Sequence, residues 1–174
     1  MAVLASALNS DDHSKSLALL FLDLDDFKRI NDTLGHAAGD AVLIEVAARL
    51  TATTREPDVV ARLGGDEYVV LLRDIDLDVA RNRAKDIARA VRQPIWIGER
   101  MVALSASVGV SVAVGASAHS DELLRQADAA LYRAKEVSRG ESVMFEPSWA
   151  TMDEHHVTTG ADGAPTDFLR AVDV

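Results

Sequence analysis

The sequence predicts an α/β (α+β) domain with a mixed, largely antiparallel central sheet flanked by helices. Residues 17–24 (LALLFLDL) form an apolar run bounded by acids, which is typical of a buried strand. Residues 58–63 and 67–73 are apolar segments on either side of a Gly-Gly-Asp-Glu turn, so they predict an antiparallel hairpin. Helical periodicity recurs between the strand-like segments, and no Gly-rich phosphate loop of the Walker type is present.

The first two helices follow the first strand. Residues 25–34 predict a short helix that ends at Gly35, because glycine commonly terminates helices. Asp40 can cap the next helix, in which four apolar residues recur at helical spacing: Leu43, Val46, Ala47 and Leu50. Pro57 breaks the chain before the hairpin.

The remaining elements come after the hairpin. Apolar residues at helical spacing predict a third helix over 78–92, which Pro94 stops. A β-rich region follows, with alternating small residues around Ser105 and Ser107. The expected elements from there onward are strands over 95–98 and 101–114, a helix over 121–137 and a short strand over 142–145.

Length and composition limit the protein classes. The 174 residues suffice for one domain over 17–146, with an N-terminal extension over 1–16 and a linker or disordered tail over 147–174. There is no cysteine, which excludes disulfides and thiolate metal sites and fits a cytoplasmic location. The formal charge of −10 argues against nonspecific nucleic-acid binding. No apolar run is long enough to cross a bilayer.

The hairpin turn carries the most informative chemistry of the chain. Gly64 and Gly65 tolerate the positive backbone angles of a tight turn and let a bulky ligand approach the backbone. Asp66 and Glu67 follow them, and acids at such a turn are suited to a hard cation. A plain solvated turn is the alternative interpretation.

Three segments carry distinctive patterns: residues 22–40 (LDLDDFKRINDTLGHAAGD), 61–68 (ARLGGDEY) and 127–135 (ADAALYRAK). Together they resemble the GGDEF family of diguanylate cyclases, which make cyclic di-GMP from two GTP. The resemblance covers about residues 17 to 147 and keeps the order and spacing of the family. It implies a fold like that of nucleotidyl cyclases and the polymerase palm. The family also includes members that only bind nucleotide.

The resemblance implies a metal site for Mg²⁺ or Mn²⁺. Asp23 and the backbone carbonyl of Leu24 would bind the metal from the first strand, and Asp66 would bind it from the hairpin. Glu67 would be either a ligand of a second metal ion or the base for the attacking hydroxyl, so Asp66 and Glu67 are the expected catalytic acids. An acid placed where a strand meets water is the alternative for Asp23.

The resemblance also implies a GTP site. Asn31 and Asp40 would read the guanine edge, and a helix cap is the alternative for Asp40. The remaining contacts would come from the amides of Asp26 and Phe27, from the turn glycines Gly64 and Gly65, and from the side chains of Lys28, Lys135 and Arg139. The alternative role of Lys135 and Arg139 is to complement the negative charge at the C-terminal end of a helix. Asp26 adds a negative charge that weakens GTP binding unless it points away.

Regulation and assembly form the last group of expectations. Arg55 and Asp58 stand in an R-x-x-D pattern before the hairpin, where the family has its inhibitory site for cyclic di-GMP. One site would hold one GTP, so catalysis would require a homodimer. The ending of the domain resembles the junction to a phosphodiesterase domain, and an attached sensory domain is equally expected. A noncatalytic module that binds GTP or cyclic di-GMP and regulates an attached domain is the competing interpretation.

Overall fold

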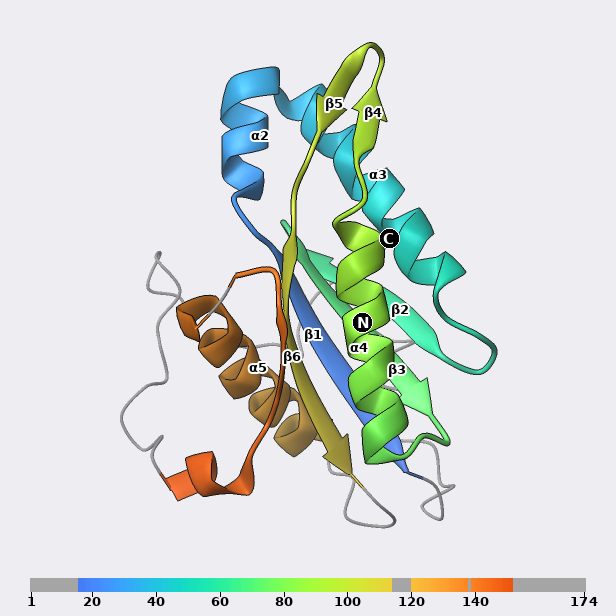
Figure 1. The fold of residues 1–174 in the computed structure, drawn as a ribbon, viewed down its shortest axis with the longest axis vertical. Coiled ribbons are helices and arrows are strands. Elements are labelled where there is room, and N and C mark those ends of the chain that lie inside the picture. The colour runs from blue at the N-terminus through green and yellow to red at the C-terminus, as the bar shows by residue number, and fades with distance from the viewer. Residues whose placement is uncertain (1–15, 114–119, 138, 152–174) are drawn as a thin grey trace.

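A computed structural model describes residues 16–113, 120–137 and 139–151 (Figure 1). Of the expected N-terminal extension only Ser16 is among them, and of the expected C-terminal tail only residues 147–151. The rest of both predicted segments lies outside the described residues.

The centre of the fold is a five-stranded sheet in the order β2-β3-β1-β6-β7. All neighbouring strands are antiparallel except β6 and β7, which are parallel, so the predicted mixed, largely antiparallel sheet is confirmed. The strands are β1 (Leu17–Leu24), β2 (Val59–Gly64), β3 (Glu67–Arg73), β6 (Ala106–Ala113) and β7 (Ser142–Met144). A separate hairpin, β4 (Ile95–Ile97) and β5 (Arg100–Val102), projects beyond the sheet (Figure 1).

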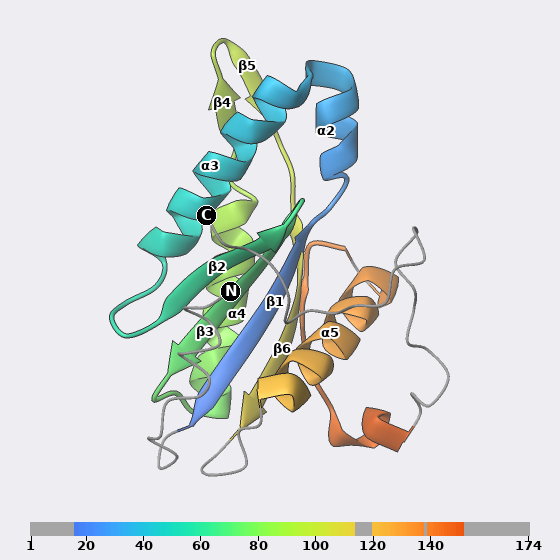
Figure 2. The ribbon, with the colours of Figure 1, turned by 180° about the vertical axis from the view of Figure 1, so that it is seen from behind.

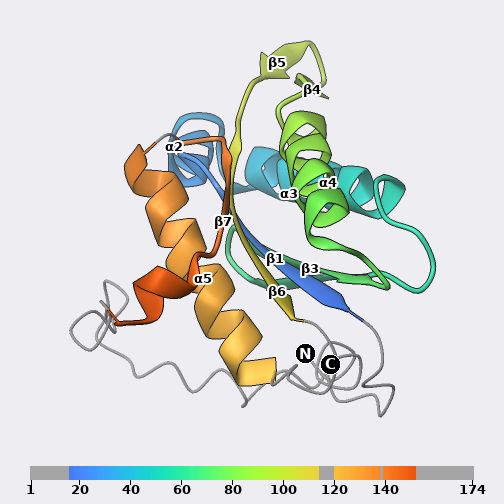
Figure 3. The ribbon, with the colours of Figure 1, turned by 60° about the horizontal axis from the view of Figure 1, so that its bottom comes forward.

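Helices cover both faces of the sheet. α3 (His36–Ala52) and α4 (Leu77–Val91) pack on one face, and α5 (Ser120–Val137) packs on the other (Figure 3). Strand β1 supplies both cores because its side chains alternate, with Leu20 and Leu22 on the α3/α4 side and Leu19 and Phe21 on the α5 side. The short helix α2 (Phe27–Leu34) precedes α3, and a short 3₁₀ helix, η2 (Pro147–Thr151), ends the described chain.

The prediction that Asp40 caps a helix is wrong. α2 and α3 are joined by Gly35 alone, whose φ of 85° is a conformation that side-chain-bearing residues rarely adopt. Because this single residue redirects the chain, α3 already begins at His36, and Asp40 lies in its second turn with its side chain exposed.

The position of α5 is fixed by a close approach to the sheet at Gly109 in β6. A Cβ there would lie 2.0 Å from the carbonyl oxygen of Ala127 and 2.2 Å from the amide nitrogen of Leu131. Figure 2 shows α5 lying along β1 and β6. This contact sets where the C-terminal end of α5, which carries Lys135, meets the end of β1.

Tyr68 joins the hairpin to α3. Its ring fills the apolar slot expected for it and is 1% exposed. The hydroxyl donates a hydrogen bond of 2.9 Å to the carbonyl oxygen of Leu43, which the sequence did not predict. Strand β3, which begins with the predicted catalytic acid Glu67, is thereby tied to α3 as well as to its neighbouring strands.

Candidate functional site

The predicted acids converge where β1 ends beside the hairpin. Asp23 lies opposite Glu67 in the register of β1 and β3. The amide of Leu24 donates to the carbonyl oxygen of Asp66 at 3.2 Å, so the end of β1 is attached directly to the turn. Arg62 braces that turn by donating from Nε and Nη2 to the carbonyl oxygen of Gly65, at 3.0 and 2.6 Å.

The space over the turn is open. A Cβ added at Gly64 or Gly65 would meet no atom within 4 Å, and Gly65 has a φ of 51°. The turn therefore needs a flexible residue at Gly65, and the fold itself does not fill the volume above either glycine. A ligand can approach the backbone there.

Two acids of the site, Asp23 and Glu67, lie where burial and neighbouring charges disfavour their ionised forms. Burial is the main reason that the pKa of Asp23 is raised, with the charges of Asp66 and Asp25 adding to it, while Lys135 acts against the shift. Burial also raises the pKa of Glu67, and the charges of Asp23 and Asp66 raise it further. The site thus concentrates negative charge that a cation would relieve.

These residues fit a divalent metal that takes some of its ligands from a substrate. Three carboxylates from two elements offer hard oxygen ligands. Within the described residues, however, no three acidic, His or Cys side chains are arranged as a complete metal site. Mg²⁺ is commonly bound by one or two carboxylates together with substrate phosphates, so a partial set agrees with that ion.

Two cations from the α5 end face the acids. The Nζ of Lys135 lies 2.8 Å from Oδ2 of Asp23, and Nη1 of Arg139 lies 3.0 Å from Oδ1 of Asp26. The helix end and the first strand are far apart in the sequence, so this pairing depends on the packing of α5 against β1. Lys135 and Arg139, two of the three cationic side chains predicted to contact GTP, thus lie beside acids of this region.

The start of α2 lies next to these cations. Asp26 has a φ of 57°, which directs the chain from β1 into the helix that Phe27 begins. The side chain of Asp26 carries no capping hydrogen bond to the helix, and it turns instead to Arg139. Phe27 is buried in the core, and Lys28 is exposed on the first turn.

The two predicted guanine readers lie on adjoining helices. A Cβ at Gly39 would lie 1.9 Å from Oδ1 of Asn31, so the amide of Asn31 rests directly on the backbone of α3. Asp40 is the next residue along α3 and is exposed. The structure therefore places the amide of Asn31 against α3 at the residue before Asp40, and Gly39 leaves room for that contact.

Sequence reasoning missed one group of polar residues beside the site. Asp25 is 8% exposed, and both of its carboxylate oxygens accept hydrogen bonds, one from Ser105 at 2.6 Å and one from Ser107 at 2.7 Å. Ser105 directly precedes β6 and Ser107 lies within it, some 80 residues along the chain from Asp25. The alternating small residues around the two serines were visible in the sequence, but that pattern did not indicate Asp25 as their partner.

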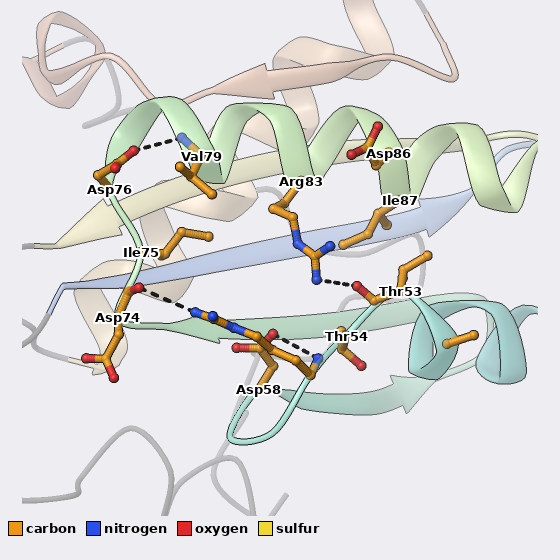
Figure 4. Close-up of a pocket in the computed structure, with 12 residues that line it drawn as sticks. Thr53, Thr54, Asp58, Asp74, Ile75, Asp76, Val79, Arg83, Asp86 and Ile87 are labelled. Atoms are coloured by element: carbon orange, nitrogen blue, oxygen red, sulfur yellow. Dashed lines mark hydrogen bonds between the residues drawn. The ribbon is translucent and has the colours of Figure 1, made fainter.

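The predicted inhibitory residues line a pocket of about 770 Å³ at the other end of the hairpin strands. Asp58 accepts from the amides of Arg55 and Arg73 at 3.2 and 3.1 Å. The guanidinium of Arg55 lies 3.3 Å from the carbonyl oxygen of Arg73 and 3.5 Å from that of Asp74. Figure 4 shows the guanidinium of Arg83, which donates to the carbonyl oxygen of Thr53. The wall also carries three further acids: Asp74, Asp76 and Asp86.

Most of the chain matches a known protein family. Residues 2–141 match the family described as "Diguanylate cyclase, GGDEF domain". The chain belongs to this family. The resemblance drawn from the three sequence segments is thereby confirmed, as is the expected fold.

Relatives of the domain include proteins with different activities in their names. The chain is 42% identical over 134 residues to the bifunctional diguanylate cyclase/cyclic di-GMP phosphodiesterase MucR of Pseudomonas aeruginosa, covering 77% of this chain and 20% of MucR. It is 40% identical over 131 residues to the cyclic di-GMP phosphodiesterase NbdA of the same organism, covering 75% of this chain and 17% of NbdA. The chain thus matches only a small part of each of these longer relatives.

A solved structure shows the same fold. The crystal structure of the GGDEF domain of TpbB (YfiN) from Pseudomonas aeruginosa superposes with a TM-score of 0.74 at 40% identity, covering 83% of this chain and 92% of that one. Among the described residues, no helix is both long and apolar enough to cross a membrane.

Proposed function

We propose that this domain is a diguanylate cyclase that condenses two GTP into cyclic di-GMP and releases pyrophosphate. In each of two equivalent steps the 3′-hydroxyl of one nucleotide attacks the α-phosphorus of the other. The new P–O bond forms as the bond to pyrophosphate breaks, and the hydroxyl proton is lost. The observation that carries the proposal is the convergence of Asp23, Asp66 and Glu67 beside the cations of the α5 end.

The acids at the β1–hairpin junction would hold Mg²⁺ or Mn²⁺. Asp23, the carbonyl of Leu24 and Asp66 would supply the ligands, and the metal would contribute charge neutralisation at the phosphates and a lowered pKa of the hydroxyl. Glu67 remains assigned either to a second metal ion or to the base.

The remaining site residues would bind GTP. Asp40 can accept from the N1–H and amine of guanine, and the amide of Asn31 can serve a donor and an acceptor on the same edge. The amides of Asp26 and Phe27 at the start of α2 would bind phosphate, as would Lys28, Lys135 and Arg139. The open space above Gly64 and Gly65 would accommodate the nucleotide.

Assembly follows from the stoichiometry of the reaction. Each site would hold one GTP, so two copies would face each other as a homodimer during catalysis. The domain would act in the cytoplasm within a longer protein that carries a sensory or a phosphodiesterase domain. The long relatives MucR and NbdA support such an arrangement, since each is matched over a small part of its length.

The pocket around Arg55 and Asp58 would bind cyclic di-GMP and inhibit synthesis. Arginine can stack on guanine and contact phosphate, and aspartate can accept from the guanine edge. The volume of about 770 Å³ is large enough for a nucleotide-sized ligand. Arg55 and Arg83 donate to backbone carbonyls through Nη2, and each guanidinium carries further N–H groups for the ligand.

The direct test is incubation with GTP and Mg²⁺, followed by chromatography for cyclic di-GMP. The wild type is expected to form product, and Asp66→Ala and Glu67→Ala are expected to lose it. Asp78→Ala on α4 is a matched control, because this exposed acid pairs only with the neighbouring Arg81 among the described residues. Product at the wild-type level in both site variants would refute the assignment of the acids.

A second candidate is a noncatalytic module that binds GTP or cyclic di-GMP and regulates an attached domain. The contact of Asp26 with Arg139 favours it, because a carboxylate engages a cation assigned to phosphate. The match to a protein named as a phosphodiesterase also agrees with it. Calorimetry that finds tight nucleotide binding without turnover, even in an enforced dimer, would select this candidate.

A further inference from the structure

Asp25 stands out among the acids of the site because its side chain is buried. Within residues 16–113, 120–137 and 139–151, it is the one acidic side chain in the buried class, at 8% exposed. A buried carboxylate is unfavourable unless hydrogen bonds compensate for its lost hydration. Both oxygens of Asp25 receive such a bond, from the hydroxyls of Ser105 and Ser107.

The backbone reinforces this contact. The amide of Asp25 donates to the carbonyl oxygen of Ser105 at 2.9 Å. Ser105, which directly precedes β6, and Ser107 within β6 therefore hold both the main chain and the side chain of Asp25. The segment between β1 and α2 is attached to the N-terminal end of β6 at this one residue by three hydrogen bonds.

The same serines also contact the segment that follows Arg139. The amide of Gly140 donates to Oγ of Ser107 at 3.3 Å. A Cβ at Gly140, whose φ is 80°, would lie 2.9 Å from Cβ and 3.0 Å from Oγ of Ser105. The glycine therefore lets the chain after α5 pack tightly against the serine pair.

Asp25 lies in the chain between a residue assigned to the metal and two residues assigned to phosphate. Leu24, just before it, would offer a carbonyl to the metal, and the amides of Asp26 and Phe27, just after it, would bind phosphate. Gly140 follows Arg139, which would bind phosphate from the other side. One buried group thus connects three segments that must keep their spacing.

We propose that Asp25, held by Ser105 and Ser107, is a positioning residue that fixes the metal-binding end of β1, the phosphate-binding start of α2 and the Arg139 segment relative to one another. This inference rests on the proposed function, because it concerns the binding of GTP at that site. Asp25 itself would touch neither substrate nor metal. Its effect would come from preorganisation, which lowers the cost of ordering these segments when the nucleotide binds.

The chain contains a matched pair of serines for the test. Ser107 and Ser111 lie on the same strand, are 0% and 1% exposed, and each donates one hydrogen bond, to Asp25 at 2.7 Å and to the carbonyl oxygen of Leu123 at 2.8 Å. Ser107→Ala removes two bonds of the network, the one to Asp25 and the one that Oγ of Ser107 accepts from the amide of Gly140. Ser111→Ala removes one bond at a distance from the network, so it controls for the loss of a buried serine hydroxyl on this strand and should lose less thermal stability.

The first measurement is the affinity for GTP with Mg²⁺ by calorimetry, on the full chain. We expect Kd to rise about tenfold in Ser107→Ala and to stay within about twofold of the wild type in Ser111→Ala. Asp25→Asn keeps the shape and one acceptor oxygen, and a serine hydroxyl can accept from its amide. It should therefore bind more tightly than Asp25→Ala.

The second measurement is hydrogen exchange of the protein without nucleotide. The amides of Leu24 and Asp25 should exchange faster in Ser107→Ala and at the wild-type rate in Ser111→Ala. If the two serine variants bind GTP equally and exchange equally at these amides, Asp25 has only a structural role and the inference is wrong. If the wild type binds no GTP, the proposed function fails first, and the inference fails with it.

Discussion

The two ends of strand β3 use charged residues in opposite ways. At the hairpin end, Glu67 faces Asp23, and burial and like charges raise the pKa of both. At the other end, the carboxylate of Asp58 accepts from two backbone amides. Like charges repel one another at the hairpin end, and a metal ion would relieve that repulsion. At the other end, hydrogen bonds from the protein itself stabilise the carboxylate. Charges at the first end should therefore cost stability, and those at the second should contribute to it.

The largest expected effect is that of Glu67→Gln. Turnover should fall at least about 100-fold, whereas the thermal midpoint at pH 7 without metal should rise by a few degrees. The folded-state pKa of Glu67 lies above its unfolded value, so its ionisation destabilises the fold as pH rises through the folded pKa. The gain should disappear below about pH 4, where both states are protonated. A thermal midpoint below that of the wild type at pH 7 would contradict the stored repulsion.

Asp58→Ala should have the opposite signature. Two backbone amides lose their acceptor, so the free energy of unfolding should fall by about 2 kcal/mol in chemical denaturation. Arg55→Ala removes an exposed side chain with long hydrogen bonds and should cost less than about 0.5 kcal/mol. Both variants should lose inhibition by added cyclic di-GMP. Equal losses of unfolding free energy in the two variants would contradict the expected difference between Asp58 and Arg55.

Tyr68→Phe tests the link between the hairpin and α3. Loss of the bond from the hydroxyl to the carbonyl of Leu43 should lower the free energy of unfolding by about 1 kcal/mol. The ring stays in its buried slot, so GTP affinity should be unchanged. Calorimetric binding beside a denaturation curve checks both, and unchanged stability would mean that the hydrogen bond contributes nothing.

The smallest expected effect is at the pair between Asp26 and Arg139. Asp26→Asn removes the negative charge and keeps a residue type that tolerates positive φ. Arg139 would then be available to phosphate, and Kd for GTP should fall about threefold, since exposed ion pairs contribute little. The gain should shrink as salt is added. Weaker binding in the variant would indicate that Asp26 supports the site.

The sequence predicted most of the fold because its signals are local. The apolar run of β1, the Gly-Gly turn and the helical periodicities each depend on a few neighbouring residues, and all appear in the structure. The parallel pairing of β7 with β6 and the separate β4–β5 hairpin depend on long-range packing and were not predicted. The cap assigned to Asp40 failed because Gly35 alone connects α2 and α3.

The site was predictable where its residues fall in the segments that resemble the GGDEF family. Asp23, Asp66 and Glu67 were named as a group, and they lie together. The contact of Asp25 with Ser105 and Ser107 was not predictable, because it joins residues 80 and 82 positions apart and neither partner is unusual alone. The engagement of Asp58 by backbone amides was hidden for a related reason, since a pattern of side chains does not show which main-chain groups they meet.

A crystal structure with Mg²⁺ and a nonhydrolysable GTP analogue tests the central claim most directly. We predict a metal ion bound by Asp23 and Asp66 beneath the triphosphate, with Lys135 and Arg139 on the phosphates and guanine between α2 and α3. A nucleotide bound elsewhere, or a metal that these carboxylates do not contact, would contradict the account.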